Sequence, residues 1–285
     1  MNLFLANDTS SSDHAGCKAV MRSIRKVLSE VQRINIIGTS SHNHLEVDEA
    51  AFDAADILLV NGEGTIHHSG VRARFLLNLI ARAKRVGKKV MLVNALFQQY
   101  EWPDEEILDG LSLLAVREPR SARFAAKFGG RPEILLDSAA DPLFLVDGVA
   151  ERLSNGRVIG GFHEKGLLYD PFAEIDGQRI TMRRRNFEDI VATLRCAEVY
   201  LTAQHHGVYA AALAGCPFVA TPSNSHKIES FIEWSGLPIP ICMSIQEIPS
   251  AMVFAIRNRT MFTELADILR QRSVLTPSRF TEALY

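Results

Sequence analysis

One stretch in the last third of the chain constrains the fold more than any other. A short apolar run at Val199–Thr202 stops at a polar turn, Gln204–Gly207, and small residues at helical spacing follow as far as Gly215. A second apolar run begins after Cys216-Pro217. This order predicts a strand, a polar turn, a helix and another strand, the unit whose turn holds ligands in open α/β sheets. We therefore expect chemistry at the two histidines of that turn.

The same alternation continues through the rest of the chain. Further strands are predicted at residues 3–6, 34–38, 56–60, 90–93, 111–116, 157–162 and 239–243, and helices at 15–31, 71–86, 103–109, 120–128, 187–196, 228–234, 245–258 and 260–271. Strands that alternate with helices predict an α/β fold with parallel sheets. The pattern weakens near residues 149–156, so we expect one α/β domain at 1–150, a second at 157–272 and a tail at 273–285.

Composition narrows the classes of protein to consider. The chain has 285 residues, 47% of them hydrophobic, and a net charge of −2. It can bury a sizeable core, and the lack of basic excess argues against nucleic acid as a partner. Its four cysteines form no C-x-x-C pair, which favours a reducing compartment. Since no export signal or long apolar stretch is visible, we expect a cytoplasmic protein whose membrane contact, if any, is peripheral.

A glycine turn follows the predicted strand at 56–60. Its sequence is Asn61-Gly62-Glu63-Gly64-Thr65. Two glycines let backbone approach a ligand closely, and they place a single carboxylate beside it. A plain glycine turn with a solvated glutamate is the alternative.

Other charged residues also follow predicted strands. Arg117 is placed to hold an anion, with a surface ion pair as the alternative. Asp137 and Asp141 either face the site or cap the following turn. Ligands of parallel sheets bind beyond the carboxyl ends of the strands, so we expect these side chains and His206 to meet across one cleft.

Two further features are ambiguous on sequence alone. The polar loop Asn7–His14 precedes a helix, whose free N–H groups make it a candidate anion site, or a simple cap. The run Arg183-Arg184-Arg185 is interpreted as a solvated patch, with docking of a phosphorylated acceptor or anionic lipid as the alternative.

Four motifs in order resemble the polysaccharide pyruvyl transferase family, from the first strand to about Leu237. They are Val60–Thr65, Ala115–Ser121, Asp141-Pro142, and Thr202–Gly207 with Ala210–Pro217 and Lys227. The resemblance implies a fold like that of GT-B glycosyltransferases, with two Rossmann-like domains facing a cleft. It also implies transfer of a pyruvyl group from phosphoenolpyruvate to a hydroxyl of a glycan or lipid-linked glycan, without a cofactor.

The residues that match the family motifs supply the candidate site. The candidate catalytic residues are Glu63, His206, Asp137 and Asp141. The candidate substrate-binding residues are Asn61, Gly62, Gly64, Thr65, Arg117, Gln204, His205, Gly207 and Lys227.

The chain departs from the family pattern at two places. Gln204-His205 stands where the family has Arg-Leu, and a neutral amide cannot replace a charged bidentate fork. Glu63 stands where a third glycine is common. Both departures bear on the identity of the donor.

These departures keep a glycosyltransferase in view as an alternative. The glycine turn and the nearby carboxylates are similar to those of retaining 3-deoxy-manno-octulosonate (Kdo) transferases, which use a nucleotide-activated sugar, CMP-Kdo. In that interpretation Asp137 or Asp141 is the nucleophile, Glu63 the acid/base and His206 a phosphate contact.

Two other classes are less favoured. A metal hydrolase is suggested by the pairs His42/His44, His67/His68 and His205/His206, but adjacent histidines point apart and no H-E-x-x-H spacing is present. We therefore expect no metal. A non-catalytic member that binds a glycan or a protein partner is supported only by the altered Arg-Leu pair.

Overall fold

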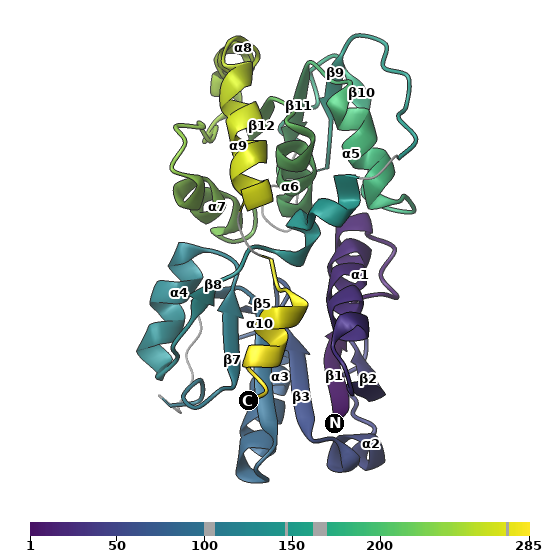
Figure 1. The fold of residues 1–285 in the computed structure, drawn as a ribbon. Coiled ribbons are helices and arrows are strands. Elements are labelled where there is room, and N and C mark those ends of the chain that lie inside the picture. Colours follow the sequence, from purple (N-terminus) through teal and green to yellow (C-terminus); the bar gives the residue numbers. More distant parts are fainter. Residues whose placement is uncertain (100–105, 146–147, 162–169, 272–273) are drawn as a thin grey trace. The chain divides into compact units, whose positions relative to one another are not determined.

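The computed structural model describes residues 1–99, 106–145, 148–161, 170–271 and 274–285. Contacts between residues divide the chain into two compact units (Figure 1). Unit 1 comprises Met1–Ser11, Met21–Ser138 and Val274–Tyr285, and unit 2 comprises Ser12–Val20 and Ala139–Ser273. Each unit has an α/β architecture of its own.

Unit 1 is built on a six-stranded parallel sheet of order β2-β1-β3-β5-β7-β8. Its strands are β1 (Asn2–Asp8), β2 (Asn35–Ser41), β3 (Ile57–Asn61), β5 (Lys89–Ala95), β7 (Leu113–Val116) and β8 (Glu133–Ile134), and a separate pair is formed by β4 (Ile66–His67) and β6 (Phe97–Gln98). Every residue of β3 is buried, as expected for a central parallel strand covered on both faces.

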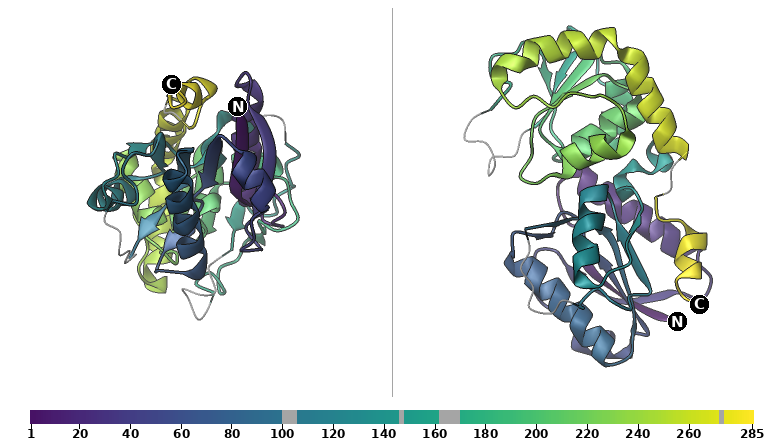
Figure 2. Two further views of the ribbon diagram at one scale, coloured as in Figure 1. Left: turned by 90° about the horizontal axis from the view of Figure 1, so that it is seen from below. Right: turned by 90° about the vertical axis from the view of Figure 1, so that its left-hand side faces the viewer.

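The helices of unit 1 cover both faces of this sheet. They are α2 (Glu49–Ala54), α3 (Val71–Arg85), α4 (Pro119–Ala125), α10 (Pro277–Glu282) and the part of α1 (Ala15–Glu30) that begins at Met21, with a short 3-10 helix at Ala126–Phe128. Figure 2 shows α1 and α10 on one side of the sheet and α3 on the other. Right-handed crossovers place them so, because the chain moves from β1 to β2 in one direction and from β3 to β5 in the other.

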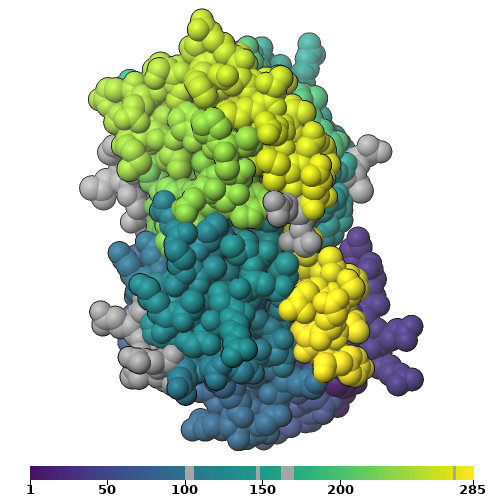
Figure 3. Space-filling view, turned by 60° about the vertical axis from the view of Figure 1, so that its left-hand side comes forward, coloured from purple at the N-terminus to yellow at the C-terminus, as the bar shows by residue number. Residues whose placement is uncertain are grey.

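The C-terminal segment belongs to unit 1, although the sequence assigned it no structure. Phe280 and Leu284 are buried. Arg279 Nε donates to Glu133 Oε1 of β8 at 2.8 Å, and Lys89 Nζ donates to the Leu284 carbonyl oxygen. Figure 3 shows this yellow segment lying against the teal and purple parts of the same unit.

Unit 2 is built on a four-stranded parallel sheet of order β10-β9-β11-β12. Its strands are β9 (Arg157–Ile159), β10 (Gln178–Arg179), β11 (Val199–Thr202) and β12 (Phe218–Ala220). Its helices are α5 (Phe187–Arg195), α6 (His205–Ala214), α7 (Lys227–Ser235), α8 (Ile248–Arg257) and α9 (Arg259–Gln271), with short 3-10 helices at Pro142–Leu145 and Ile245–Glu247. A third 3-10 helix, Ser138–Ala140, spans the point where the chain passes from unit 1 to unit 2.

Helix α6 lies at the centre of unit 2. All of its residues from His205 to Leu213 are buried, and it packs against α5 and α9. A helix without a polar face is stable only when it is surrounded by other elements. It ends at Gly215, whose φ of 63° is the left-handed conformation that glycine adopts without strain.

The predicted α/β fold with parallel sheets is confirmed, and several details differ. The strand predicted at 239–243 is wrong, because only an isolated bridge joins Ile241 to Ala220. The units meet in sequence between Ser138 and Ala139, ahead of the boundary predicted near residue 150. The strand predicted at 157–162 and the helix predicted at 103–109 each reach positions outside the described residues, and the described part of the latter, residues 106–109, is a turn and not a helix. Within the described ranges, no helix combines the length and apolar character needed to cross a membrane.

Candidate functional site

Three asparagines form a fixed polar platform at the carboxyl ends of the central strands of unit 1. Asn7 Nδ2 donates to the Asn61 carbonyl oxygen at 2.6 Å, and Asn94 Nδ2 lies 3.4 Å from Asn61 Oδ1. Asn7 and Asn94 have φ values of 61° and 55°, in the left-handed region that asparagine tolerates better than most residues. Hydrogen bonds thereby join the asparagines of neighbouring strands beside the glycine turn.

Glu63 is held by this platform. Its Oε2 accepts hydrogen bonds from Thr9 Oγ1 at 2.8 Å and from Asn61 Nδ2 at 3.3 Å, and the residue is only 9% exposed. Thr65 Oγ1 donates to the Glu63 carbonyl oxygen at 2.5 Å. The alternative of a solvated glutamate on a plain turn is therefore wrong, because the carboxylate is buried and oriented by neighbours.

Packing and backbone conformation explain why glycine occupies both positions of the turn. A Cβ atom on Gly62 would lie 2.8 Å from Cα of Ala95, so glycine is needed for β3 to lie against β5. Gly64 has a φ of 51°, which side chains rarely adopt. At Gly62, the lack of a side chain therefore lets β3 lie close to the backbone of β5.

Arg117 lies beside the glycine turn and forms a buried ion pair. Its Nη1 is 2.6 Å from Asp137 Oδ2, and the two side chains are 1% and 0% exposed. A Cβ atom on Gly64 would lie 3.7 Å from Arg117 Nη2, and Arg117 Nε has no hydrogen-bond partner among the described residues. Of the two alternatives for Arg117, the structure has the ion pair, formed in the interior and not on the surface.

Asp141 acts as a cap. Its Oδ1 accepts a hydrogen bond from the Leu143 backbone N–H at 2.9 Å, at the start of the 3-10 helix Pro142–Leu145. Asp141 belongs to unit 2 and Asp137 to unit 1. The two acids therefore have different partners and different environments.

In unit 2, the turn between β11 and α6 carries Gln204 and the histidine pair. Gln204 is the N-cap residue of α6, and its backbone N–H donates to Thr202 Oγ1 at 3.0 Å. Its side chain lies against Gly161, where a Cβ atom would meet Gln204 Nε2 at 2.5 Å. His205 packs edge-on against Tyr209, with ring centroids 4.7 Å apart. Gly207 lets α6 approach β11, because a Cβ atom there would lie 2.8 Å from Thr202 Oγ1.

His206 lies against the segment that begins α1, which the contacts assign to unit 2. The His14 and His206 ring centroids are 5.3 Å apart. A Cβ atom on Gly16 would lie 2.2 Å from Cγ of His206. A ring nitrogen of each histidine and Sγ of Cys17 lie within 4.8 Å of one another. Sequence analysis placed His14 in a possible anion loop and did not connect it or Cys17 with His206.

Positive charge surrounds this group. Burial is the main reason that the pKa of His14 falls to about 3, and the charges of His206, Arg183 and Lys227 lower it further. Lys227 begins α7, and its Nζ donates to Asn224 Oδ1 at 2.6 Å. The environment of His14 is therefore both dry and electropositive.

Backbone contacts fix Arg183 near the start of α1. The Ala15 N–H donates to the Met182 carbonyl oxygen at 2.6 Å, and the Arg184 N–H donates to the Asp13 carbonyl oxygen at 2.8 Å. The Arg183 side chain is 75% exposed and lies 3.9 Å from Asp13. One of the helix N–H groups predicted to bind an anion is thus occupied by the protein's own carbonyl.

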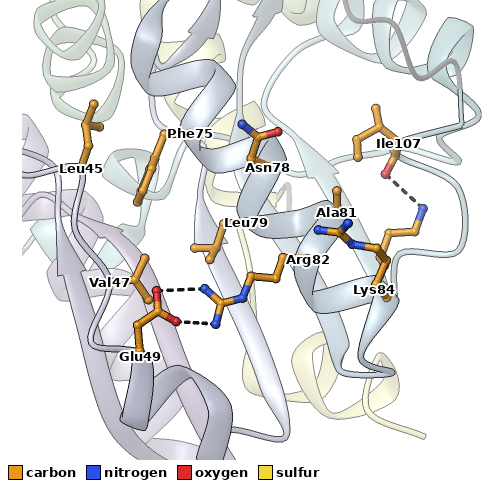
Figure 4. A pocket seen from close by; sticks show the side chains of 11 residues that line it. Leu45, Val47, Glu49, Phe75, Asn78, Leu79, Ala81, Arg82, Lys84 and Ile107 are labelled. Atoms are coloured by element: carbon orange, nitrogen blue, oxygen red, sulfur yellow. Dashed lines mark hydrogen bonds and ion pairs between the residues drawn. The ribbon is translucent and has the colours of Figure 1, made fainter.

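A cavity of about 650 Å³ opens elsewhere in unit 1, beside α3. Figure 4 shows its lining, in which Arg82 pairs with Glu49, and Lys84 Nζ donates to the Ile107 carbonyl oxygen at 3.2 Å. No residue of the predicted site lines it. We therefore do not assign the chemistry to this cavity.

A family model described as polysaccharide pyruvyl transferase matches residues 7–225, well over half of the chain. The chain belongs to the polysaccharide pyruvyl transferase family. The protein is therefore a transferase. The match includes the glycine turn, the Arg117 motif and the histidine pair and ends just before Lys227.

Solved structures with the same fold are GT-B glycosyltransferases and an epimerase. Spinosyn rhamnosyltransferase SpnG complexed with thymidine diphosphate matches with a TM-score of 0.57 and 11% identity, covering 100% of both chains. UDP-GlcNAc 2-epimerase from Neisseria meningitidis bound to UDP-GlcNAc matches at 0.56 and 8%, covering 100% of this chain and 98% of that one.

An uncharacterized protein from Klebsiella pneumoniae subsp. pneumoniae NTUH-K2044 matches with a TM-score of 0.52 and 15% identity, covering 83% of this chain and 89% of that one. No curated protein matches the chain in sequence. At these identities the structural likenesses establish the fold, and they confirm the GT-B-like prediction.

Proposed function

We propose that this family member transfers a pyruvyl group from phosphoenolpyruvate to a glycan hydroxyl in polysaccharide biosynthesis. The observation that supports this most directly is the electropositive group at the start of α1 and α6. Phosphoenolpyruvate carries a phosphate and a carboxylate on one small skeleton, and both need positive or hydrogen-bonding partners. Arg183, Lys227 and the His206 imidazole are the groups whose charges act on His14.

The replacement of arginine by Gln204 is compatible with this role if other groups carry the charge. Gln204 packs against Gly161 and contributes only an amide. In the proposal, Arg183 and Lys227 supply the charge that the family arginine would provide, and His206 contacts the bound donor. Lysine and arginine differ in geometry, so the donor is held differently from the bidentate pattern.

The reaction needs proton transfer as well as anion binding. The donor methylene carbon gains a proton and becomes the methyl group of the ketal, a sugar hydroxyl loses its proton as its oxygen bonds to the central carbon, and phosphate leaves. A second hydroxyl of the same sugar then bonds to the same carbon and closes the ketal, and its proton passes to the released phosphate. Glu63 is the group we assign to proton transfer, because it is buried and oriented by Thr9 and Asn61.

Asp137 is assigned a positioning role. Its carboxylate is neutralised by Arg117 in a site without solvent access, which makes a poor nucleophile for a retaining glycosyl transfer. A buried ion pair that lies beside the glycine turn is well suited to holding that turn in place.

Calorimetry with the full chain tests the donor. Phosphoenolpyruvate should bind, and Arg183→Met, Lys227→Met and His206→Ala should each weaken binding tenfold or more. Arg184→Met is the matched control, because its charge is not among those that act on His14. Binding of cytidine monophosphate without binding of phosphoenolpyruvate would overturn the proposal in favour of the CMP-Kdo alternative. A glycan-dependent release of phosphate from phosphoenolpyruvate would complete the demonstration.

A further inference from the structure

Three side chains of unit 2 converge in a way that the proposed transfer reaction does not require. His14 ends the loop before α1, Cys17 lies in the first turn of that helix, and His206 lies in the first turn of α6. One donor atom from each, two imidazole nitrogens and a thiol sulfur, lie within 4.8 Å of one another. All three belong to the same unit, so their arrangement does not depend on the other.

We propose that His14, Cys17 and His206 form a binding site for a thiophilic divalent cation, with Zn²⁺ as the ion of best fit. Two imidazoles and one thiolate are a ligand set that zinc accepts in three-ligand sites that keep a fourth position open. Hard cations such as Mg²⁺ and Ca²⁺ prefer oxygen ligands and are poorly matched by this set.

The spacing suits such an ion after a small adjustment. With Zn–N near 2.0 Å and Zn–S near 2.3 Å, ligand atoms around a tetrahedral zinc lie roughly 3.3–3.8 Å apart. The donor atoms here lie within 4.8 Å of one another. Closing the difference takes shifts of the donor atoms by roughly 1 Å, which small rotations of the partly buried His14 and Cys17 side chains can provide.

Two further observations favour a built site over a chance cluster. His14 Nδ1 is buried and has no hydrogen-bond partner among the described residues, so it is a ready ligand whose binding breaks no hydrogen bond. Gly16 lies between His14 and Cys17 in sequence, and its lack of a side chain makes room for the His206 ring, since a Cβ atom there would overlap the ring. The close approach of the two helix starts therefore depends on this glycine.

A metal ion at this site would also help to bind the anionic donor, and this part of the inference rests on the proposed function. The site lies at the start of the helix that Gln204 caps, where the family pattern has an arginine. A cation with an open position there adds to the positive charge of Arg183 and Lys227 and can accept a carboxylate or phosphate oxygen. The metal site itself stands on the three side chains alone and does not depend on the identity of the donor.

The experiment uses the full chain without a polyhistidine tag, stripped of metal and titrated with Co²⁺. We expect binding of one ion per chain, the near-ultraviolet charge-transfer band of a Co²⁺–thiolate bond, and displacement of the band by Zn²⁺. Cys17→Ser should abolish the band, and His14→Gln and His206→Gln should each weaken binding at least tenfold. Cys196→Ser is the matched control, since Cys196 is exposed at the end of α5, and it should leave the spectrum unchanged.

A second variant guards against an effect on folding. His14→Cys keeps a metal-binding side chain at this position and should bind Co²⁺ with a stronger thiolate band. His14→Gln has no such side chain and should bind Co²⁺ more weakly. The proposal is overturned if the wild-type chain binds no stoichiometric ion, or if the thiolate band persists in Cys17→Ser. Since no donor is present in this measurement, its failure is distinguishable from a failure of phosphoenolpyruvate to bind in calorimetry.

Discussion

Gly16 and His206 are in a contact that leaves no room for any other residue at position 16, because a Cβ atom there would lie 2.2 Å from His206 Cγ. Two residues 190 positions apart in sequence thereby fix the first turns of α1 and α6 against each other. The position of the His206 imidazole is set by backbone packing as well as by its own helix.

Replacing this glycine should displace the imidazole. Gly16→Ala is expected to lower transferase turnover at least tenfold and to lower the free energy of unfolding by about 1–3 kcal/mol, since it inserts a methyl group into a filled site. Activity assays and urea unfolding measure the two effects. Gly70→Ala is the control, because a Cβ atom there meets only the His67 carbonyl oxygen at 3.6 Å. Equal behaviour of the two variants would mean that the α1–α6 contact is looser than described.

The Arg117–Asp137 pair gives a prediction about stability. Asp137→Asn leaves a buried guanidinium without its counter-charge and should lower the free energy of unfolding by about 3–5 kcal/mol. The double variant Arg117→Met/Asp137→Asn should recover much of that loss. Urea unfolding of the wild type, both single variants and the double variant measures the coupling.

The same set of variants tests the nucleophile role of Asp137. If Asp137 positions the glycine turn, turnover should rise with stability in the double variant. A double variant that is stable yet fully inactive, while Asp137→Glu stays active, would favour the retaining glycosyltransferase alternative.

Local sequence patterns predicted the elements whose ends are marked by residues within the element or next to it. Strand β11 has the predicted bounds, Val199–Thr202, and α6 ends where glycine adopts the left-handed conformation at Gly215. The buried strand β3 was likewise visible from its continuous apolar run. In each case a strand end, a cap or an uninterrupted apolar run lies within a few residues.

Features that depend on distant partners could not be predicted. The helical pattern of α1 indicates an apolar face, but nothing local says that its first turn packs with α6 and the rest in unit 1. Arg117 pairs with Asp137, 20 residues away, and nothing in the residues next to Arg117 indicates this partner. The group of His14, Cys17 and His206 could not be predicted for the same reason, because its members come from two elements that lie far apart in sequence.

Asp8 and Arg25 give a prediction about pH. Burial raises the pKa of the Asp8 carboxyl, but hydrogen bonds from Ser10 and Arg25 outweigh this effect and hold the pKa below its ordinary value. A carboxyl whose folded pKa is depressed stabilises the fold above its unfolded pKa, and this contribution is lost as the pH falls through the folded pKa. Arg25→Gln should therefore cost about 0.5–1 kcal/mol of unfolding free energy near pH 7, and less as the pH falls through the lowered pKa of Asp8.

Unfolding by urea at neutral and acidic pH measures this difference. Lys26→Gln removes an exposed charge from the neighbouring position of the same helix and should have no comparable pH-dependent effect. A loss for Arg25→Gln that is equally large at both pH values would show that packing of the arginine stem, and not its charge on Asp8, stabilises the fold.

The substitution Glu63→Gln distinguishes a role of Glu63 in proton transfer from a role in supporting the fold. In Glu63→Gln the amide oxygen can still accept the hydrogen bonds that Thr9 and Asn61 donate to Oε2, so the fold and donor binding should be retained. Loss of the ionisable group should lower kcat by about 10²–10⁴, the usual contribution of a positioned acid or base. Glu30→Gln, at the exposed end of α1, controls for the loss of one negative charge. Near-wild-type turnover in Glu63→Gln would move proton transfer to another residue and leave Glu63 as a support of the glycine turn.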